Sequence, residues 1–308
     1  MVFRNAGASS VVVLLSALAA CDGEATDPPA PVEPAASETA AISTNDAAAE
    51  QLELHKLPCG TIEISDLDLF STAGDYAGVP DTFTNTCWLV RHPNGDLLWD
   101  LGLPGMLTAA GPQDQGIFTV SLSTTLREVL AARGIPMETI EQVSISHSHF
   151  DHIGQVDQIA PTTKWLVHQD EYAFMFPSDG ENPPDNAAQF APFGDLEAVT
   201  FSGKRDVFGD GSVLIHETPG HTPGHTSLQV NLPDTGPVFL TGDLYHRAES
   251  RVLRRVPQFN WDVENADAPG AITTASMDAF EAIVASVNGQ VIIQHEPVDV
   301  DAFPDVSY

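Results

Sequence analysis

Hydrophobic and polar residues alternate with a period of two, or form short apolar runs, in several segments of the chain. Such segments are typical of β-strands that bury one or both faces. They cover residues 61–69, 84–91, 97–99, 140–146, 164–167, 199–201, 212–216, 226–231, 238–240 and 291–294. The turn sequence Pro93-Asn94-Gly95-Asp96 separates the second segment from the third, which predicts a β-hairpin there.

Apolar positions at the helical spacing of three and four residues are less common. They predict helices over residues 122–133, 153–159, 170–176 and 276–287. The segment 177–194 is rich in Pro, Asn, Asp and Gly and is predicted to be a long loop. Because each half of the chain runs strands first and a helix later, we predict an α/β fold with two packed sheets and helices outside.

The N-terminal residues have the features of an export signal. Arg4 precedes an apolar run at 11–20 that is too short to span a bilayer. The run ends Leu18-Ala19-Ala20-Cys21, which resembles the bacterial lipoprotein signal, in which cleavage precedes a Cys that becomes acylated. We expect a signal peptide over residues 1–21, export to the bacterial periplasm or cell envelope, and membrane attachment only through lipid on Cys21. An ordinary signal peptide with an incidental Cys is the alternative.

Composition separates the next segment from the folded domain. Residues 22–50 are acidic and rich in Ala and Pro, and we expect a disordered tether because they cannot bury enough apolar area to fold. The folded domain is then expected over residues 51–308. The whole chain has 43 acidic residues against 12 Lys and Arg, a formal net charge of −31. No basic face for nucleic acid is available, so that class of partner is excluded.

Two cysteines remain beside Cys21, namely Cys59 and Cys87. In an oxidising compartment an even pair is consistent with a disulfide. Two buried free thiols are the other interpretation, and the sequence leaves both open.

Four potential metal ligands lie close together directly after the strand predicted at 140–146. They are His147, His149, Asp151 and His152. Imidazole is the commonest zinc ligand in proteins, and carboxylate suits a second position. Alternate residues on an extended segment point the same way, so His147 and His149 can bind one ion while Asp151 and His152 face another. A buried structural histidine accounts for one such residue but not for this cluster.

Three further segments place a candidate ligand at the end of a predicted strand. The first is Thr218-Pro219-Gly220-His221-Thr222-Pro223-Gly224-His225, in which two tight turns each present a His. The others are Asp243, after the apolar strand that ends at Leu240, and His295, after Gln294. Sites in open α/β folds lie at strand ends in this way.

In order and spacing these residues resemble the metallo-β-lactamase superfamily from about residue 59 to 300, as does the turn Asp100-Leu101-Gly102. The resemblance implies an αββα sandwich of two mixed sheets and two Zn²⁺ per chain, or other divalent transition metals. It implies a first metal site at His147, His149 and His221, and a second at Asp151, His152 and His295, with Asp243 bridging both. His225 competes with His221, and relatives with a repeated Pro-Gly-His favour the earlier residue.

The resemblance also implies a hydrolase in which a metal-bridging hydroxide attacks the substrate. Asp151 would orient the hydroxide and later pass a proton to the leaving group. A bridging Asp243 argues against a true β-lactamase, and the segments 218–228 and 240–243 are most similar to N-acyl homoserine lactonases, which open a quorum-sensing lactone. We expect a small neutral lactone with an apolar tail. Arylester, phosphotriester and thioester hydrolases are rivals, as is a non-catalytic metal-binding lipoprotein.

The sequence leaves open which residues contact the substrate. Lactonases place a Tyr three residues after the bridging Asp, where this chain has His246 preceded by Tyr245, so both are catalytic candidates. The arginine-containing segment 247–261 is either a lid over the substrate or, as we prefer, a salt-bridged surface loop. Side chains for an acyl groove, or otherwise for the core, are Phe150, Phe174, Met175, Phe176, Phe259 and Trp261.

Overall fold

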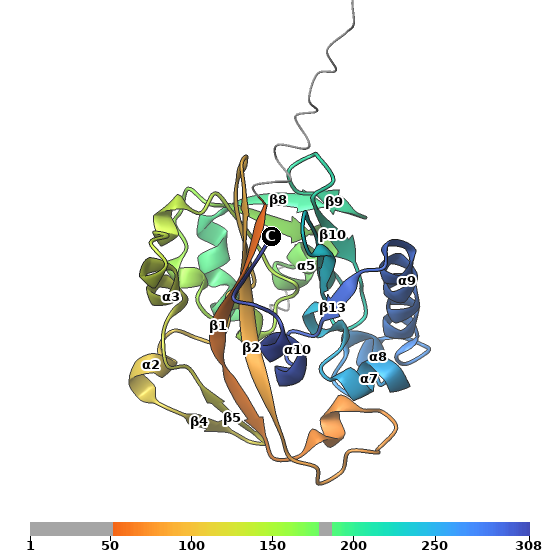
Figure 1. Cartoon of the computed structure of the whole chain (residues 1–308). Coiled ribbons are helices and arrows are strands. Elements are labelled where there is room, and N and C mark those ends of the chain that lie inside the picture. Colours follow the sequence, from red (N-terminus) through yellow and green to blue (C-terminus); the bar gives the residue numbers. More distant parts are fainter. Residues whose placement is uncertain (1–51, 179–186) are drawn as a thin grey trace, which may run out of the picture. The chain divides into compact units, whose positions relative to one another are not determined.

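Two β-sheets pack face to face in residues 52–178 and 187–308, the part of the chain that the computed structural model describes (Figure 1). In that part the larger sheet has nine strands, in the order β4 (Gln113–Gln115), β5 (Phe118–Ser121), β1 (Glu53–Ile64), β2 (Asp81–His92), β3 (Gly95–Trp99), β6 (Gln142–Ser144), β7 (Lys164–His168) and β8 (Glu197–Phe201), with β14 (Val306–Ser307) beside β1. The smaller sheet has the order β13 (Gln290–Ile292), β12 (Gly236–Leu240), β11 (Thr226–Leu232), β10 (Val213–Glu217) and β9 (Arg205–Asp206).

Helices pack on the outer faces of both sheets, whereas α10 (Pro297–Ala302) places Val300 in the layer between them. The other helices are α2 (Leu107–Ala110), α3 (Leu126–Ala132), α4 (Phe150–Ile153), α5 (Gln169–Met175), α6 (Ala187–Phe190), α7 (Ala248–Leu253), α8 (Trp261–Asn265) and α9 (Ala271–Val287). Short 3-10 turns are η1 (Leu67–Phe70), η2 (Met137–Thr139), η3 (Val156–Gln158), η4 (Ala191–Asp195) and η5 (Gly242–Leu244). Figure 1 shows α3 on one side of the strands and α9 on the other.

Strand alternation divides the core into layers. On β2, Trp88 and Val90 point into the layer between the sheets, where they meet residues such as Ile215 and Leu240 of the smaller sheet. Cys87 and Leu89, which alternate with them along the strand, point instead toward α3 and α5. A third layer joins Phe239 of β12 to the buried face of α9. The predicted αββα arrangement is therefore confirmed, because both sheets bury two faces.

Most predicted elements are present with shifted ends. The hairpin of β2 and β3 forms around the predicted turn, and Thr125 caps α3 through a capping box with Glu128. The loop predicted over 177–194 is partly wrong, because its described residues include α6 and the start of η4, held by buried Phe190 and Phe193. The segment 247–261 is a loop only in part, because residues 248–253 form α7 and Trp261 begins α8, while residues 254–260 are not helical.

Cys59 of β1 and Cys87 of β2 form a disulfide with a Cα–Cα distance of 5.7 Å, so the disulfide interpretation is confirmed. The predicted signal peptide, Cys21 and the 22–50 tether lie outside the described residues. Within the described residues, no helix has the length and apolar character needed to cross a membrane.

Candidate metal centre

Seven side chains converge where strands of both sheets end. They are His147, His149, Asp151 and His152, which follow β6, together with His221 between β10 and β11, Asp243 after β12 and His295 after β13. β6 lies parallel to β3 in one sheet, and β13 lies parallel to β12 in the other, so their carboxyl ends meet at the same edge of the sandwich. The structure thus brings together every metal ligand predicted from the sequence.

Three histidines form what we call the first ligand group. His147 Nε2 lies 3.0 Å from His149 Nδ1, and His221 Nε2 lies 3.2 Å and 2.9 Å from these two atoms. Asp151, His152 and His295 form the second ligand group. His152 Nε2 lies 3.2 Å from His295 Nε2, and Asp151 Oδ2 lies 3.6 Å and 3.5 Å from these nitrogens.

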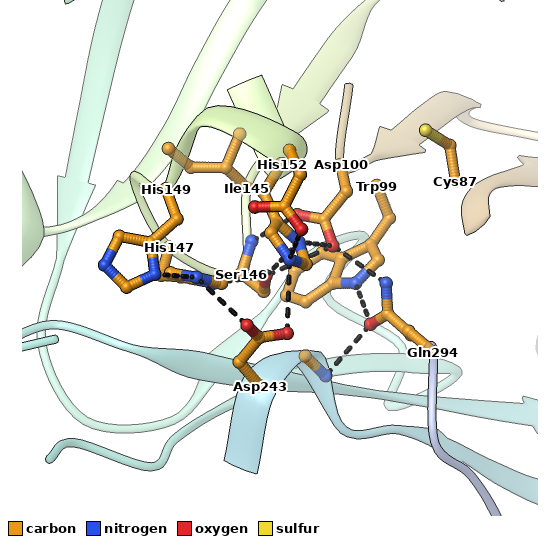
Figure 2. A network of polar contacts seen from close by, with 12 residues as sticks. Cys87, Trp99, Asp100, Ile145, Ser146, His147, His149, His152, Asp243 and Gln294 are labelled. Carbon is orange, nitrogen blue, oxygen red and sulfur yellow. Dashed lines mark hydrogen bonds and ion pairs between the residues drawn. The ribbon is translucent and has the colours of Figure 1, made fainter. Parts of the chain in front are cut away.

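Asp243 lies between the two groups with one carboxylate oxygen facing each. Oδ2 is 3.6 Å from His147 Nε2 and 3.3 Å from His221 Nε2. Oδ1 is 3.2 Å from His152 Nε2 and 3.0 Å from His295 Nε2. Figure 2 shows this carboxylate beneath His147 and His152, joined to both. A carboxylate placed in this way can bridge two cations.

Four of the histidines have their outward ring nitrogen occupied. Nδ1 of His147 contacts Ser146 Oγ at 3.1 Å, and Nδ1 of His152 contacts Asp100 Oδ2 at 3.0 Å. The acceptors are Asn260 Oδ1 for His221, at 2.7 Å, and the Thr84 carbonyl for His295, at 2.9 Å. When Nδ1 carries the proton and donates outward, Nε2 presents a lone pair to the centre, as metal-ligating histidines require.

Asp100, at the end of β3, is the hub of the second ligand group's support. Its carboxylate accepts hydrogen bonds from Ser146 N at 2.6 Å, Ser146 Oγ at 3.1 Å and Gln294 Nε2 at 2.8 Å, besides contacting His152. Gln294 in turn accepts from Trp99 Nε1 at 3.1 Å (Figure 2). Asp100 has φ of 61°, a left-handed conformation that is unfavourable for residues other than glycine. The hydrogen bonds hold it there.

Glu171 of α5 performs a comparable role for the first ligand group. Its Oε1 accepts from Ser148 N at 2.7 Å, and its Oε2 accepts from Thr222 Oγ1 at 2.7 Å and Gly224 N at 3.1 Å. This side chain therefore links the loop that carries His147 and His149 to the loop that carries His221. Burial raises the pKa of Glu171, although these donors act to lower it.

Electrostatics distinguish the two groups. Burial lowers the pKa of His147 and of His149 well below the ordinary histidine value, which keeps both imidazoles neutral. Burial also acts to lower the pKa of His152 and of His295, but nearby carboxylates, Asp243 first, raise both overall. The second ligand group therefore contains an excess of negative charge that a cation would offset.

The donor set fits divalent cations. When the outer ring nitrogen of each histidine carries the proton, the inner nitrogens that face the centre are all acceptors and cannot hydrogen bond to one another. Their short contacts therefore need an electron-pair acceptor between them. Among the described residues, buried Asp243 Oδ1 has no hydrogen-bond donor of suitable geometry. Nitrogen and carboxylate ligands in sets of four suit zinc, and the shared carboxylate suits two ions side by side.

A cavity of about 270 Å³ opens above the cluster. Its floor contains His149, Asp151, Asp243, His246 and His295, and its walls contain Ile62, Leu69, Phe70, Phe83, Phe118, Phe150 and Phe259. Of the predicted acyl-groove residues, Phe150 and Phe259 line this cavity. Phe174, Met175, Phe176 and Trp261 do not, and Met175 belongs to the core between the larger sheet and its helices. An apolar wall over a polar floor suits an uncharged substrate with a reactive polar group.

The two catalytic candidates after Asp243 point in opposite directions. His246 is buried beside the cavity, with Nε2 3.0 Å from Asp243 Oδ2 and its ring at the edge of Phe70. The Tyr245 hydroxyl points elsewhere, donating to Glu281 at 3.1 Å and accepting from Arg254 at 2.9 Å. The prediction that Tyr245 is catalytic is therefore wrong, because the extended backbone at this residue sends neighbouring side chains to opposite sides.

His225 and the arginines of 247–261 both lie outside the site. His225 belongs to neither ligand group, because its Nδ1 contacts Thr218 and its Nε2 accepts from Asp243 N at 2.9 Å. The arginines form ion pairs rather than a substrate lid, with Arg247 to Asp81, Arg251 to Glu281, Arg254 to Asp278 and Arg255 to Asp75. None of these arginines lines the cavity above the cluster.

Beyond Asp100, the sequence pattern did not identify the residues that support the ligands. Glu171, Asn260 and Gln294 carry no motif and contact partners far away in sequence. Asn85 is also absent from the predictions, although its Nδ2 donates to the Asp151 carbonyl at 3.0 Å and to Asp151 Oδ2 at 3.3 Å. The only available signal was position, because Gln294 directly precedes a predicted ligand.

Comparison with known proteins agrees with this geometry. A profile of the metallo-beta-lactamase superfamily matches residues 80–295. N-acyl homoserine lactonase AttM of Azorhizobium caulinodans is 26% identical over 82% of this chain and 95% of its own length. A solved N-acyl homoserine lactone hydrolase with the product N-hexanoyl-L-homoserine at its catalytic metal centre superposes with a TM-score of 0.67, at 21% identity, over 82% of this chain and 96% of that one. AidC, a dizinc quorum-quenching lactonase, superposes with a TM-score of 0.60, at 19% identity, over 83% and 89%.

Proposed function

The chain belongs to the metallo-β-lactamase superfamily, and we propose on this basis that it is a dinuclear metal hydrolase that opens the ring ester of a lactone. The first ion would be held by His147, His149 and His221, and the second by Asp151, His152 and His295. Zinc is the proposed metal, and a different divalent transition metal is the alternative. The observation that carries the proposal is the Asp243 carboxylate, which presents one oxygen to each ligand group.

The protein's own groups have separable tasks in this reaction. Two bound cations would supply Lewis acidity and a water of lowered pKa. Asp151 lies on the cavity floor and is held by Asn85, so it can orient the attacking water and return a proton to the leaving alkoxide. The apolar walls exclude competing water, and His246 contacts Asp243 at the cavity's edge.

N-acyl homoserine lactone is the proposed substrate, which would make the reaction quorum quenching. Two observations support it. Relatives that match most of this chain carry that activity in their names, and the cavity has phenylalanine walls suited to an acyl tail. The folded part keeps 36 acidic residues against 11 Lys and Arg, because residues 1–50 contain seven and one, respectively. A neutral lactone is not repelled by such a surface, unlike an anionic substrate.

We also propose that the protein acts outside the cytoplasm, anchored by lipid on Cys21. The lipoprotein-like sequence at Leu18–Cys21 supports this location. The Cys59–Cys87 disulfide is consistent with it, since disulfides persist in oxidising compartments. Metabolic labelling with a clickable palmitate analogue tests the anchor, and a Cys21→Ala chain that incorporates as much label would refute it.

One sample can test metal content and activity together. Purified protein is assayed for zinc and for hydrolysis of homoserine lactones of several acyl lengths, an aryl ester, a phosphotriester and a thioester. We expect two ions per chain and kcat/KM of about 10⁴ M⁻¹ s⁻¹ or more on one lactone. If the enzyme hydrolyses another substrate class better, that class replaces the lactone in the proposed function. Two bound ions with no turnover on the whole panel would identify a metal-binding lipoprotein instead, and protein stripped by a chelator is the control.

A further inference from the structure

The Cys59–Cys87 disulfide lies at an irregular point of the larger sheet. β1 and β2 pair in antiparallel register up to Pro58 and resume at Gly60, so Cys59 is an extra residue in a β-bulge. A bulge interrupts the hydrogen bonds between two strands and often re-aims side chains beside an active site. The disulfide therefore joins the two strands at the place where their hydrogen-bond ladder is interrupted, and both cysteines are fully buried.

Three residues directly before Cys87 contact the second ligand group or its support. The Thr84 carbonyl accepts from His295 Nδ1 at 2.9 Å. Asn85 Nδ2 donates to Asp151 Oδ2 at 3.3 Å, and the Thr86 carbonyl accepts from Gln294 Nε2 at 3.2 Å. This part of β2 thus fixes one nitrogen ligand and one carboxylate ligand.

The bulged residue itself contacts the turn that supports the remaining ligand. The Cys59 carbonyl accepts from Leu103 N at 3.2 Å. A Cβ added to Gly102 would lie 2.6 Å from Cys59 Cβ, so only glycine lets the turn rest on the disulfide. Leu101 N donates to the His152 carbonyl at 2.8 Å. The same turn begins with Asp100, which contacts His152 Nδ1.

All three members of the second ligand group are thereby connected to the disulfide within a few bonds. The first ligand group has its own support in Asn260 and Glu171, and it shares Ser146 with Asp100 of the second. In the view of Figure 2, Cys87 lies on the side of Asp100 and Gln294, with His147 and His149 on the other side of the cluster. The contacts therefore distinguish the two groups.

We propose that the Cys59–Cys87 disulfide is a positioning element for the second ligand group, and that removing it weakens binding of the second metal ion while leaving the first ion in place. The inference rests on the dinuclear function proposed above. Opening the disulfide frees β1 and β2 to move at the bulge. Asp151 and His295 then lose their alignment with His152, because β2 holds the first two residues and the turn that rests on Cys59 holds His152.

The test compares metal affinity in the oxidised wild-type chain and in the double variant Cys59→Ala/Cys87→Ala, which has no thiols at these positions to bind zinc. Zinc is titrated against a chromophoric chelator, and two dissociation constants are fitted. We expect the weaker constant to rise at least tenfold and the tighter one to change less than threefold. Wild-type protein reduced by a phosphine, which opens the disulfide to two thiols and becomes the phosphine oxide, should also hold the second ion more weakly than oxidised wild type.

A matched control separates positioning from general stability. Val284→Ala or Phe280→Leu, both in the core between α9 and the smaller sheet, is chosen for a loss of Tm equal to that of the double variant. The control should retain both ions with wild-type affinity. If the double variant binds both ions as wild type does, loses both together, or fails to fold, the disulfide acts on the whole domain and the proposal is wrong. Oxidised wild type that binds no metal would instead refute the proposed function.

Discussion

The two ligand groups use similar side chains but draw their support from different parts of the fold. The first group is held by helices and loops, with Glu171 of α5 between its two loops and Asn260 before α8 behind His221. The second group is held by strands and strand ends, through β2 and Asp100 after β3. The second group is held by the Thr84 carbonyl together with the Asn85 and Asp100 side chains, all on or beside β2 and β3, whereas the first group depends on Glu171 and Asn260 from helix and loop segments. Local damage should therefore affect the two groups unequally.

Removing Asp243, the ligand that both groups share, should weaken the binding of both metal ions to a similar extent. Asp243→Ala takes one carboxylate oxygen from each group, so both ions should weaken together and kcat/KM should fall by about 10³-fold or more, since several kcal/mol of charge stabilisation disappears. Lactone hydrolysis and zinc content measure the effect. Asp278→Asn, an exposed carboxylate on α9 paired with Arg254, is the control and should behave as wild type. An Asp243→Ala protein with full activity would contradict a bridged pair.

A change at Asp100 should weaken the second group far more than the first, which Asp100 reaches only through Ser146. Asn tolerates the left-handed backbone at this position, so Asp100→Asn removes the negative charge behind His152 without adding strain. We expect the second ion to bind about 10- to 100-fold more weakly and the first ion to change less than about threefold. Zinc competition titration gives both constants. The matched control is Asp96→Asn, a buried carboxylate on the same strand that pairs with Arg91. Equal weakening of both ions would show that the groups are not separately supported.

A change at Glu171 should weaken binding of the first metal ion more than binding of the second. Glu171→Gln replaces one carboxylate oxygen by an NH₂ group that faces a donor, which should cost about 1–3 kcal/mol of folding free energy. Since the two loops of the first group lose their link, the first ion should bind up to about tenfold more weakly. Chemical unfolding and zinc titration measure these effects. Asp170→Asn, its exposed neighbour on α5, is the control. Selective loss of the second ion in Glu171→Gln would reverse our assignment of the supports.

Ligand residues were predictable from the sequence because each follows an apolar strand and several share a short motif. The fold class was predictable for the same reason, since strands such as Val238–Leu240 are short continuous apolar runs. His221 was preferred over His225 only through a family resemblance. Geometry supplies the physical reason, because His225 supports the Asp243 backbone from outside both groups.

Several features of the site depend on tertiary contacts that no local pattern encodes. Glu171 is an ordinary acidic residue on a short helix until the fold brings two distant loops to its carboxylate. The directions of Tyr245 and His246 depend on the backbone after η5, which the hydrophobic pattern does not determine. α7 is only six residues long and contains one arginine, Arg251, so the segment 247–261 resembles a loop or lid until the ion pairs of its arginines are known.

The left-handed backbone of Asp100 is a poor guide to which residue this position should carry. Glycine would relieve about 1–2 kcal/mol of backbone strain in that conformation. It would also remove the carboxylate that accepts from Ser146, Gln294 and His152, and each buried donor left without an acceptor costs about 1–3 kcal/mol. The loss exceeds the gain, so a screen for heat resistance should reject glycine at position 100, as a screen for turnover would. Thermostability and activity therefore select the same residue at this position in any engineered descendant of this chain.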